Sequence, residues 1–179
     1  RLHGWDLNSG AVRVAVFSLY IALLEQVDPP DIRQLIKKGK VLPELWGNTL
    51  KHQDFFDVEP RDALVDVVIG NPPWTSRRGP DRSSARWCTA HNLPMPGKED
   101  AWAFTWKSML HLRGDGIVAF LLPAMGFLHN HANTSVAARN QLIVSTQIRR
   151  VINFADLRFQ LFEGALRPTS LIIFGKADS

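Results

Sequence analysis

The feature that most constrains the fold is an apolar, β-branched run that stops abruptly at two consecutive prolines. Residues 63–70 read Ala-Leu-Val-Asp-Val-Val-Ile-Gly, and Asn71-Pro72-Pro73-Trp74 follows directly. Such a run is typical of a strand buried in a sheet. Proline has no backbone N–H and cannot take part in the ladder of a central strand. The sequence therefore predicts a buried strand with a rigid segment at its carboxyl end.

Helical and strand-like patterns alternate along the rest of the chain. A helix is predicted after Asn8 or Ser9, either of which can cap it, and Asp28-Pro29-Pro30 ends it. A second helix begins near Lys98 and ends at Gly114, with Trp102 and Trp106 in the core. Another helix is predicted over residues 135–146, and strands are predicted near Asp54 and over residues 116–123, 148–154 and 168–175.

This alternation predicts an α/β fold: a mostly parallel sheet with helices on both faces. The 179 residues, 45% of them hydrophobic, suffice for one domain with a core, assigned to residues 1–179. Residues 31–47 read as irregular, with room for a short helical turn. Residues 75–97 read as a long loop, which in a compact domain is usually functional or disordered. In such sheets ligands bind beyond the carboxyl ends of the strands.

Composition narrows the class of protein. No apolar run approaches the ~18 residues of a membrane helix, which predicts a soluble protein without a membrane partner. The single cysteine, Cys88, excludes an internal disulfide and fits a reducing cytoplasm. The histidines show no zinc spacing, and no metal site is predicted; His129 and His131 fit a solvated loop. The formal net charge of +4 is compatible with binding to nucleic acid.

Basic residues gather directly after the proline segment. Arg77, Arg78, Arg82 and Arg86 lie within residues 75–90 against one acid, Asp81. This cluster fits contact with a phosphate backbone, and a solvated loop is the plain alternative.

The segment Asn71-Pro72-Pro73-Trp74 suits recognition of a flat ring that carries an amine. Consecutive prolines leave carbonyl oxygens without neighbouring amide donors, Asn71 adds a side-chain carbonyl, and Trp74 adds a large flat face. Two acceptors on an adenine amine would localise its lone pair, so that it could attack a methyl donor. The base must first leave the duplex, and stacking on Trp74 offsets part of that cost.

On these residues the chain resembles the amino-group DNA methyltransferases, specifically the adenine-N6 type found in type I modification subunits and type II restriction–modification fusions. The resemblance implies a Rossmann-like fold that uses S-adenosylmethionine. It also implies that the Asn71 side chain and the Pro72 carbonyl bind the target amine, next to Pro73, while Trp74 stacks on the flipped adenine of double-stranded DNA.

Other motifs follow in the family's order. Asp6 in "GWDLNSG" resembles the acid that binds the cofactor ribose, although a helix N-terminal Asp is the plain alternative. Asp54 and Phe55 in "HQDFF" resemble the residues at the cofactor adenine, with Asp57 as the weaker choice. Phe104 matches a pocket aromatic. Phe162 matches an aromatic beside the flipped base, or else belongs to the core, and Arg77 and Arg78 face DNA.

One departure affects the expected activity. The family's glycine-rich first motif should precede Asp6, and the only Gly-x-Gly, Gly114-Asp115-Gly116, reads as a turn. We therefore expect an incomplete methyltransferase fold that is inactive as it stands or is complemented by a missing segment or another chain. The expected partner is a specificity subunit or a fused target-recognition domain.

The rival hypotheses are a methyltransferase for glutamine or RNA adenine, and a catalytically silent module that binds DNA or a partner. An enzyme lacking one strand should expose an apolar sheet edge, whereas a self-contained binding module should bury it. Asn71, where serine would favour cytosine-N4, points to adenine.

Overall fold

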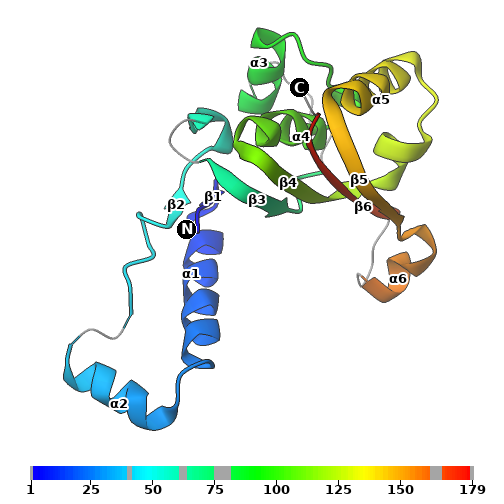
Figure 1. The fold of residues 1–179 in the computed structure, drawn as a ribbon. Helices are drawn as coiled ribbons and strands as arrows, with labels where there is room; N and C mark the ends of the chain where they lie inside the picture. The colour runs from blue at the N-terminus through cyan, green and yellow to red at the C-terminus, as the bar shows by residue number, and fades with distance from the viewer. Residues whose placement is uncertain (1, 40–41, 61–63, 75–81, 162–166, 178–179) are drawn as a thin grey trace. The chain divides into compact units, whose positions relative to one another are not determined.

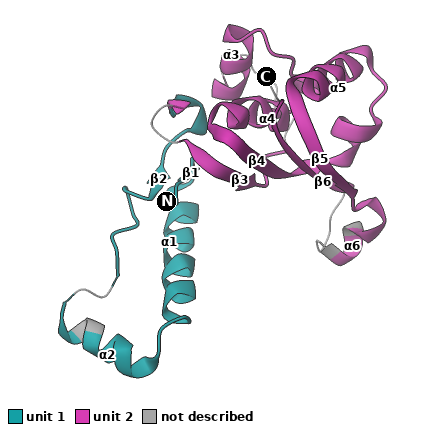
Figure 2. Cartoon of the chain, viewed as in Figure 1, with its two compact units in different colours: residues 1–58 teal, residues 59–179 magenta. Residues whose placement is uncertain are grey.

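The chain forms two compact units, residues 1–58 and 59–179 (Figure 2). The computed structural model describes residues 2–39, 42–60, 64–74, 82–161 and 167–177. Each unit is described by itself, and the assignment of residues 1–179 to a single catalytic domain stays a prediction.

The first unit is built on two short parallel strands and a long helix (Figure 1). Its elements are β1 (Gly4–Asp6), α1 (Ser9–Leu24), α2 (Pro29–Lys37), β2 (Leu50–His52) and the 3-10 turn η1 (Phe55–Asp57). Asn8 caps α1, as predicted, because its side chain accepts hydrogen bonds from the N–H groups of Gly10 and Ala11.

Helix α2 is longer than the short helical turn allowed within residues 31–47, and it begins before them, at Pro29. Pro29 and Pro30 open this helix, whereas α1 already ends at Leu24, before the prolines. Proline fits the first turn of a helix, where its missing N–H would have no partner in any case. Asp28 supports this start, because its carbonyl accepts the N–H groups of Asp31 and Ile32.

The second unit carries a four-stranded sheet in the order β3-β4-β6-β5. Its strands are β3 (Val65–Gly70), β4 (Leu112–Pro123), β5 (Thr146–Asn153) and β6 (Thr169–Lys176). Its helices and turns are α3 (Ser83–Ala90), η3 (Pro96–Lys98), α4 (Asp100–Leu110), the π-helical turn η4 (Met125–His129), α5 (Asn133–Ser145), η5 (Ala155–Leu157) and α6 (Arg158–Leu161).

Strands β3, β4 and β5 run in one direction, and only β6 runs the opposite way. Strand β3 pairs with β4 in parallel, while β6 pairs antiparallel with both β4 and β5. The sheet is therefore mostly parallel in strand direction, as the sequence predicts. The reversed β6 was not predicted, because an apolar run does not reveal which way its strand points.

The core lies against one face of this sheet. Val118, Phe120 and Leu122 of β4 share that face with Ile172 and Phe174 of β6, and all five are buried. Helix α4 is buried on nearly all sides, and the predicted core residues Trp102 and Trp106 lie within it. The opposite face is more open at β3, where Val67 and Ile69 are 53% and 78% exposed.

Gly114 and Gly116 form a bulge rather than the predicted turn. Helix α4 ends at Leu110 and β4 already begins at Leu112. Val65 pairs with Leu112 and Val67 with Ile117, so extra residues of β4 bulge out between these pairs. A Cβ on Gly116 would lie 3.0 Å from the Arg113 carbonyl oxygen and 3.1 Å from that of Asp66, which explains why glycine fits here.

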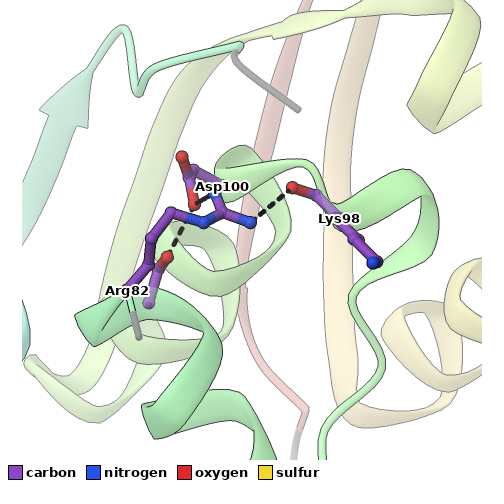
Figure 3. Close-up of polar contacts among 4 residues, drawn as sticks. Arg82, Lys98 and Asp100 are labelled. Atoms are coloured by element: carbon purple, nitrogen blue, oxygen red, sulfur yellow. Dashed lines mark hydrogen bonds and ion pairs between the residues drawn. The ribbon is translucent and has the colours of Figure 1, made fainter. Parts of the chain in front are cut away.

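A second correction concerns residues 75–97, which are not one long loop. Helix α3 and the turn η3 lie within them. Arg82, counted above among the basic residues facing phosphate, instead forms an ion pair with buried Asp100 and donates to the Lys98 carbonyl at 3.1 Å (Figure 3). Ser84 also donates to Asp100, at 2.6 Å. These bonds tie the start of α3 to the start of α4.

We expect Asp100→Ala to lower the free energy of unfolding by about 3 kcal/mol, because it leaves the Arg82 charge and the Ser84 hydroxyl without their acceptor. The matched control is Asp66→Ala, since Asp66 pairs with Arg113 at 3.1 Å and both side chains are exposed. This control should cost less than about 1 kcal/mol. Urea unfolding of both variants checks the prediction, and equal losses would contradict it.

Candidate active site

The predicted catalytic segment lies at the carboxyl edge of the second unit's sheet. Strand β3 ends at Gly70, directly before Asn71, and β4 and β5 end at Pro123 and Asn153. Strand β6 begins at the same edge, because it runs antiparallel to both β4 and β5. Ligand-binding groups in open α/β sheets gather at this edge.

The four residues of the segment differ in exposure. Asn71 and Pro73 are exposed, Pro72 is buried and Trp74 is half-buried. The Asn71 amide is therefore open to a ligand, while Pro72 packs into the protein and fixes the course of the chain. This arrangement is compatible with the predicted role of the segment, in which the Pro-Pro backbone carries an exposed amide.

Trp74 is held by two hydrogen bonds from different parts of the chain. Its indole N–H donates to the Leu121 carbonyl of β4 at 3.2 Å. Its own carbonyl accepts from Nη1 of Arg167 at 2.9 Å. One bond fixes the ring and the other fixes the peptide group, so the position of Trp74 is set relative to β4 and to the segment before β6.

Glu99 lies next to Arg167, and Gly126 lies next to Glu99. Oε1 of Glu99 is 3.8 Å from Nη1 of Arg167. A Cβ on Gly126, in the turn that follows β4, would lie 2.5 Å from Oε2 of Glu99. Glycine at this position therefore leaves room for the carboxylate at the edge of the sheet.

Burial and a neighbouring charge act on the pKa of the Glu99 carboxyl in opposite directions. Burial raises the pKa of the Glu99 carboxyl above its ordinary value, and the Arg167 charge acts in the opposite direction.

Burial also raises the pKa of the Cys88 thiol to about 12, with a smaller contribution from the charge of Asp100. Cys88 is thus a protonated core residue rather than a nucleophile.

The predicted cofactor residues of the first unit lie together. Asp6 ends β1, Asp54 follows β2, and the Gln53 N–H donates to the Asp6 carbonyl at 3.1 Å. Oδ1 of Asp6 accepts from the Asn8 N–H at 2.6 Å, and Oδ1 of Asp54 accepts from the Phe56 N–H at 2.8 Å. Each bond orients its carboxylate. Asp6 thus binds the residue that caps α1, which fits the alternative of a role at the start of a helix.

The remaining candidates are placed as follows. Phe55 is half-buried, and its ring centroid lies 6.0 Å from that of Trp5. Phe104 is half-buried on α4, and Asp57 is exposed. Arg77, Arg78 and Phe162 lie outside the described residues.

Sequence reasoning missed Glu99, Gly126 and Arg167. Glu99 looks like part of a helix start, and Arg167 looks like a basic residue before a strand. Only the reversal of β6 brings Arg167 to the end of β3, 93 residues away along the chain. The one available signal was Gly126, a glycine shortly after a predicted strand.

Among the described residues, no helix is long and apolar enough to cross a membrane. The same residues contain no group of three or more His, Cys, Asp or Glu side chains that could hold a metal ion.

The fold and the position of the proline segment define a methyltransferase-like α/β protein, and comparison with known proteins gives the family. The family model described as "Eco57I restriction-modification methylase" matches residues 1–162. The chain belongs to this family. No curated protein matched the chain.

Solved structures share the fold. The EcoKI M protein of a type I restriction enzyme superposes with a TM-score of 0.65 at 16% identity, over 99% of this chain and 31% of that one. The type IIG restriction endonuclease BpuSI gives 0.58 at 21%, over 73% and 16%. A class I S-adenosylmethionine-dependent methyltransferase, described as putative, from Listeria monocytogenes gives 0.54 at 23%, over 73% and 37%.

These likenesses confirm the Rossmann-like methyltransferase fold predicted from the sequence. They also show that the chain spans less than two fifths of each of these three proteins.

Proposed function

We propose that the protein is a site-specific DNA methyltransferase that transfers a methyl group from S-adenosylmethionine to the N6 amine of a flipped-out adenine. We place it in restriction–modification or phage defence. The observation that carries the proposal is the exposed Asn71 on a rigid Pro-Pro-Trp segment at the carboxyl end of β3, in a restriction–modification methylase chain.

The chemical difficulty in this reaction is the weak nucleophilicity of the target amine, whose lone pair is delocalised into the ring. The Asn71 side-chain oxygen and the Pro72 carbonyl would accept the two N–H groups of the amine. The proline rings fix the φ angles of Pro72 and Pro73. The backbone that carries both acceptors is therefore restricted before the base arrives. The lone pair then localises on nitrogen and can attack the methyl group.

Trp74 would supply the stacking surface for the extruded base. Extruding a base costs a few kcal/mol, and stacking on an aromatic ring returns about 1–3 kcal/mol. The bond from the Trp74 indole to Leu121 fixes the ring plane relative to β4. Phe162 would pack against the base, and Arg77 and Arg78 would contact the DNA backbone.

The aspartates of the first unit fit the donor groups of S-adenosylmethionine. Asp6 would accept from the ribose hydroxyls and Asp54 from the adenine amine, with Phe55 at the adenine ring. Both carboxylates are already oriented through Oδ1, so the second oxygen of each can accept a hydrogen bond from the ligand. When bound, the cofactor supplies an electrophilic methyl group.

Two rival functions are less well supported. A glutamine side chain presents the same kind of amine but no ring for Trp74 to stack on. An adenine in RNA would stack on Trp74 as well, so the choice of DNA rests on the restriction–modification methylase family. A self-contained binding module would bury the apolar side chains of its edge strand, whereas Val67 and Ile69, on one face of the edge strand β3, are exposed. A specificity subunit or a fused target-recognition domain would supply sequence recognition.

We expect Asn71→Ala in the full-length protein to reduce methyl transfer to DNA by at least roughly 100-fold, because it removes one oriented acceptor. DNA binding should stay largely intact. The measurements are transfer of labelled methyl groups from S-adenosylmethionine and a gel-shift assay. Asn140→Ala, at an exposed position of α5, is the matched control and should be fully active. Retained activity of Asn71→Ala would exclude the mechanism.

The cofactor assignment predicts a difference between two neighbouring carboxylates. Asp54→Asn keeps one oxygen to accept the Phe56 N–H but replaces the other with a donor, so Kd for S-adenosylmethionine should rise roughly tenfold. Asp57→Asn, at an exposed position, should leave Kd unchanged. Calorimetry on the full-length protein measures both. A larger effect at Asp57 would transfer the assignment to that residue.

A further inference from the structure

The segment that carries Trp74 has little backbone hydrogen bonding of its own. Pro72 and Pro73 have no N–H to donate, and β3 ends at Gly70. The described contacts that hold Trp74 are therefore the bond from its indole to Leu121 and the bond from Arg167 to its carbonyl. The first alone would leave the peptide group of Trp74 free to turn.

Arg167 occupies a backbone position that is itself fixed. The Pro168 carbonyl accepts the Ala124 N–H at 2.9 Å, and the Thr169 carbonyl accepts the Phe154 N–H at 2.8 Å. These bonds attach the chain immediately after Arg167 to the ends of β4 and β5. The Arg167 side chain thus reaches Trp74 from an anchored base at the edge of the sheet.

Glu99, from a distant segment of the chain, pairs with the Arg167 guanidinium at 3.8 Å. Its side chain is only 17% exposed, against 54% for Arg167. The carboxylate lies over Gly126, where a side chain would displace it. Glu99 is therefore a fixed, largely buried counter-charge, and Arg167 is the more exposed partner that links it to Trp74.

The energetics argue against a purely stabilising role for this contact. An ion pair at 3.8 Å with one half-exposed partner contributes little to folding. The hydrogen bond to the Trp74 carbonyl is shorter, at 2.9 Å, and acts directly on the predicted catalytic segment. Precise placement matters at such a position, because a shift of about 1 Å in an active site can reduce the rate about 100-fold.

We propose that Arg167, held by Glu99, is a positioning residue that sets the peptide group of Trp74 and thereby the orientation of the target base. The inference rests on the proposed function. Arg167 contacts neither the target amine nor the cofactor in this proposal. It acts through Trp74, and its loss affects the rate of transfer more than the binding of either substrate.

The test uses the full-length enzyme and three variants. Arg167→Met removes the charge and the donor but keeps a side chain of similar length. Arg167→Lys restores a charged donor. Arg113→Met removes an exposed arginine whose partner is Asp66 and serves as the control.

We expect Arg167→Met to lower kcat roughly 10- to 100-fold, with KM for DNA and for S-adenosylmethionine changed less than about threefold. Arg167→Lys should recover most of the lost kcat, and Arg113→Met should match the wild type. Glu99→Gln should lower kcat less than Arg167→Met and should add nothing in the Arg167→Met background, because Glu99 acts through Arg167.

Three results would overturn the inference. In the first, kcat of Arg167→Met is unchanged. In the second, KM for DNA rises with kcat intact and the salt dependence falls, as for a phosphate contact. In the third, activity and thermal stability fall together and lysine restores neither. If the wild-type enzyme methylates no DNA at all, the proposed function fails, and this inference fails with it.

Discussion

Strand β6 runs antiparallel between β4 and β5, and this position decides which residues meet at the carboxyl edge of the sheet. A parallel strand would begin at the opposite edge and would carry Arg167 away from Trp74. Because β6 is reversed, its first residues lie beside the last residues of β4 and β5, where the Ala124 and Phe154 N–H groups bind the Pro168 and Thr169 carbonyls. The candidate site thus depends on one strand direction.

The edge formed in this way combines rigid and open features. The prolines restrict the backbone after β3, and Trp74 is tied to two other segments, while the Asn71 side chain stays exposed. A group that binds an amine without a large rearrangement needs this combination, since hydrogen-bond acceptors that are already oriented cost no reorganisation during the reaction. The similarity to methyltransferase structures concerns the fold. The proposed chemistry comes instead from the residues at the carboxyl edge of the sheet.

Much of the fold could be predicted from the sequence, and the failures have local physical causes. Hydrophobic spacing and the Asn8 cap predicted α1, and the β-branched run predicted β3. The sequence pattern indicates a helix end at Pro29 and Pro30, but these prolines begin α2, because proline also suits the first turn of a helix. Gly114 and Gly116 form a bulge because β4 begins directly after α4. Helix α3 was not predicted because it lies in a segment whose composition is typical of a loop.

The candidate site also contains positions that the sequence predicts and positions that it does not predict. The positions of Asn71, Trp74, Asp6 and Asp54 could be predicted, because each lies at or shortly after the end of a strand in a short motif. Arg167 and Glu99 could not, because tertiary structure alone brings Arg167 to Trp74 and Glu99 to Arg167. Arg82 looked like a phosphate contact, but it is committed to Asp100, a buried partner 18 residues away that the sequence pattern does not reveal.

The most direct test of the central claim is to identify the methylated nucleoside. The full-length protein is incubated with labelled S-adenosylmethionine and double-stranded DNA, and the digested DNA is analysed by mass spectrometry. The account predicts label in N6-methyladenine at a defined sequence. Label in N4-methylcytosine, in RNA or in a protein glutamine, with none in DNA adenine, would contradict it.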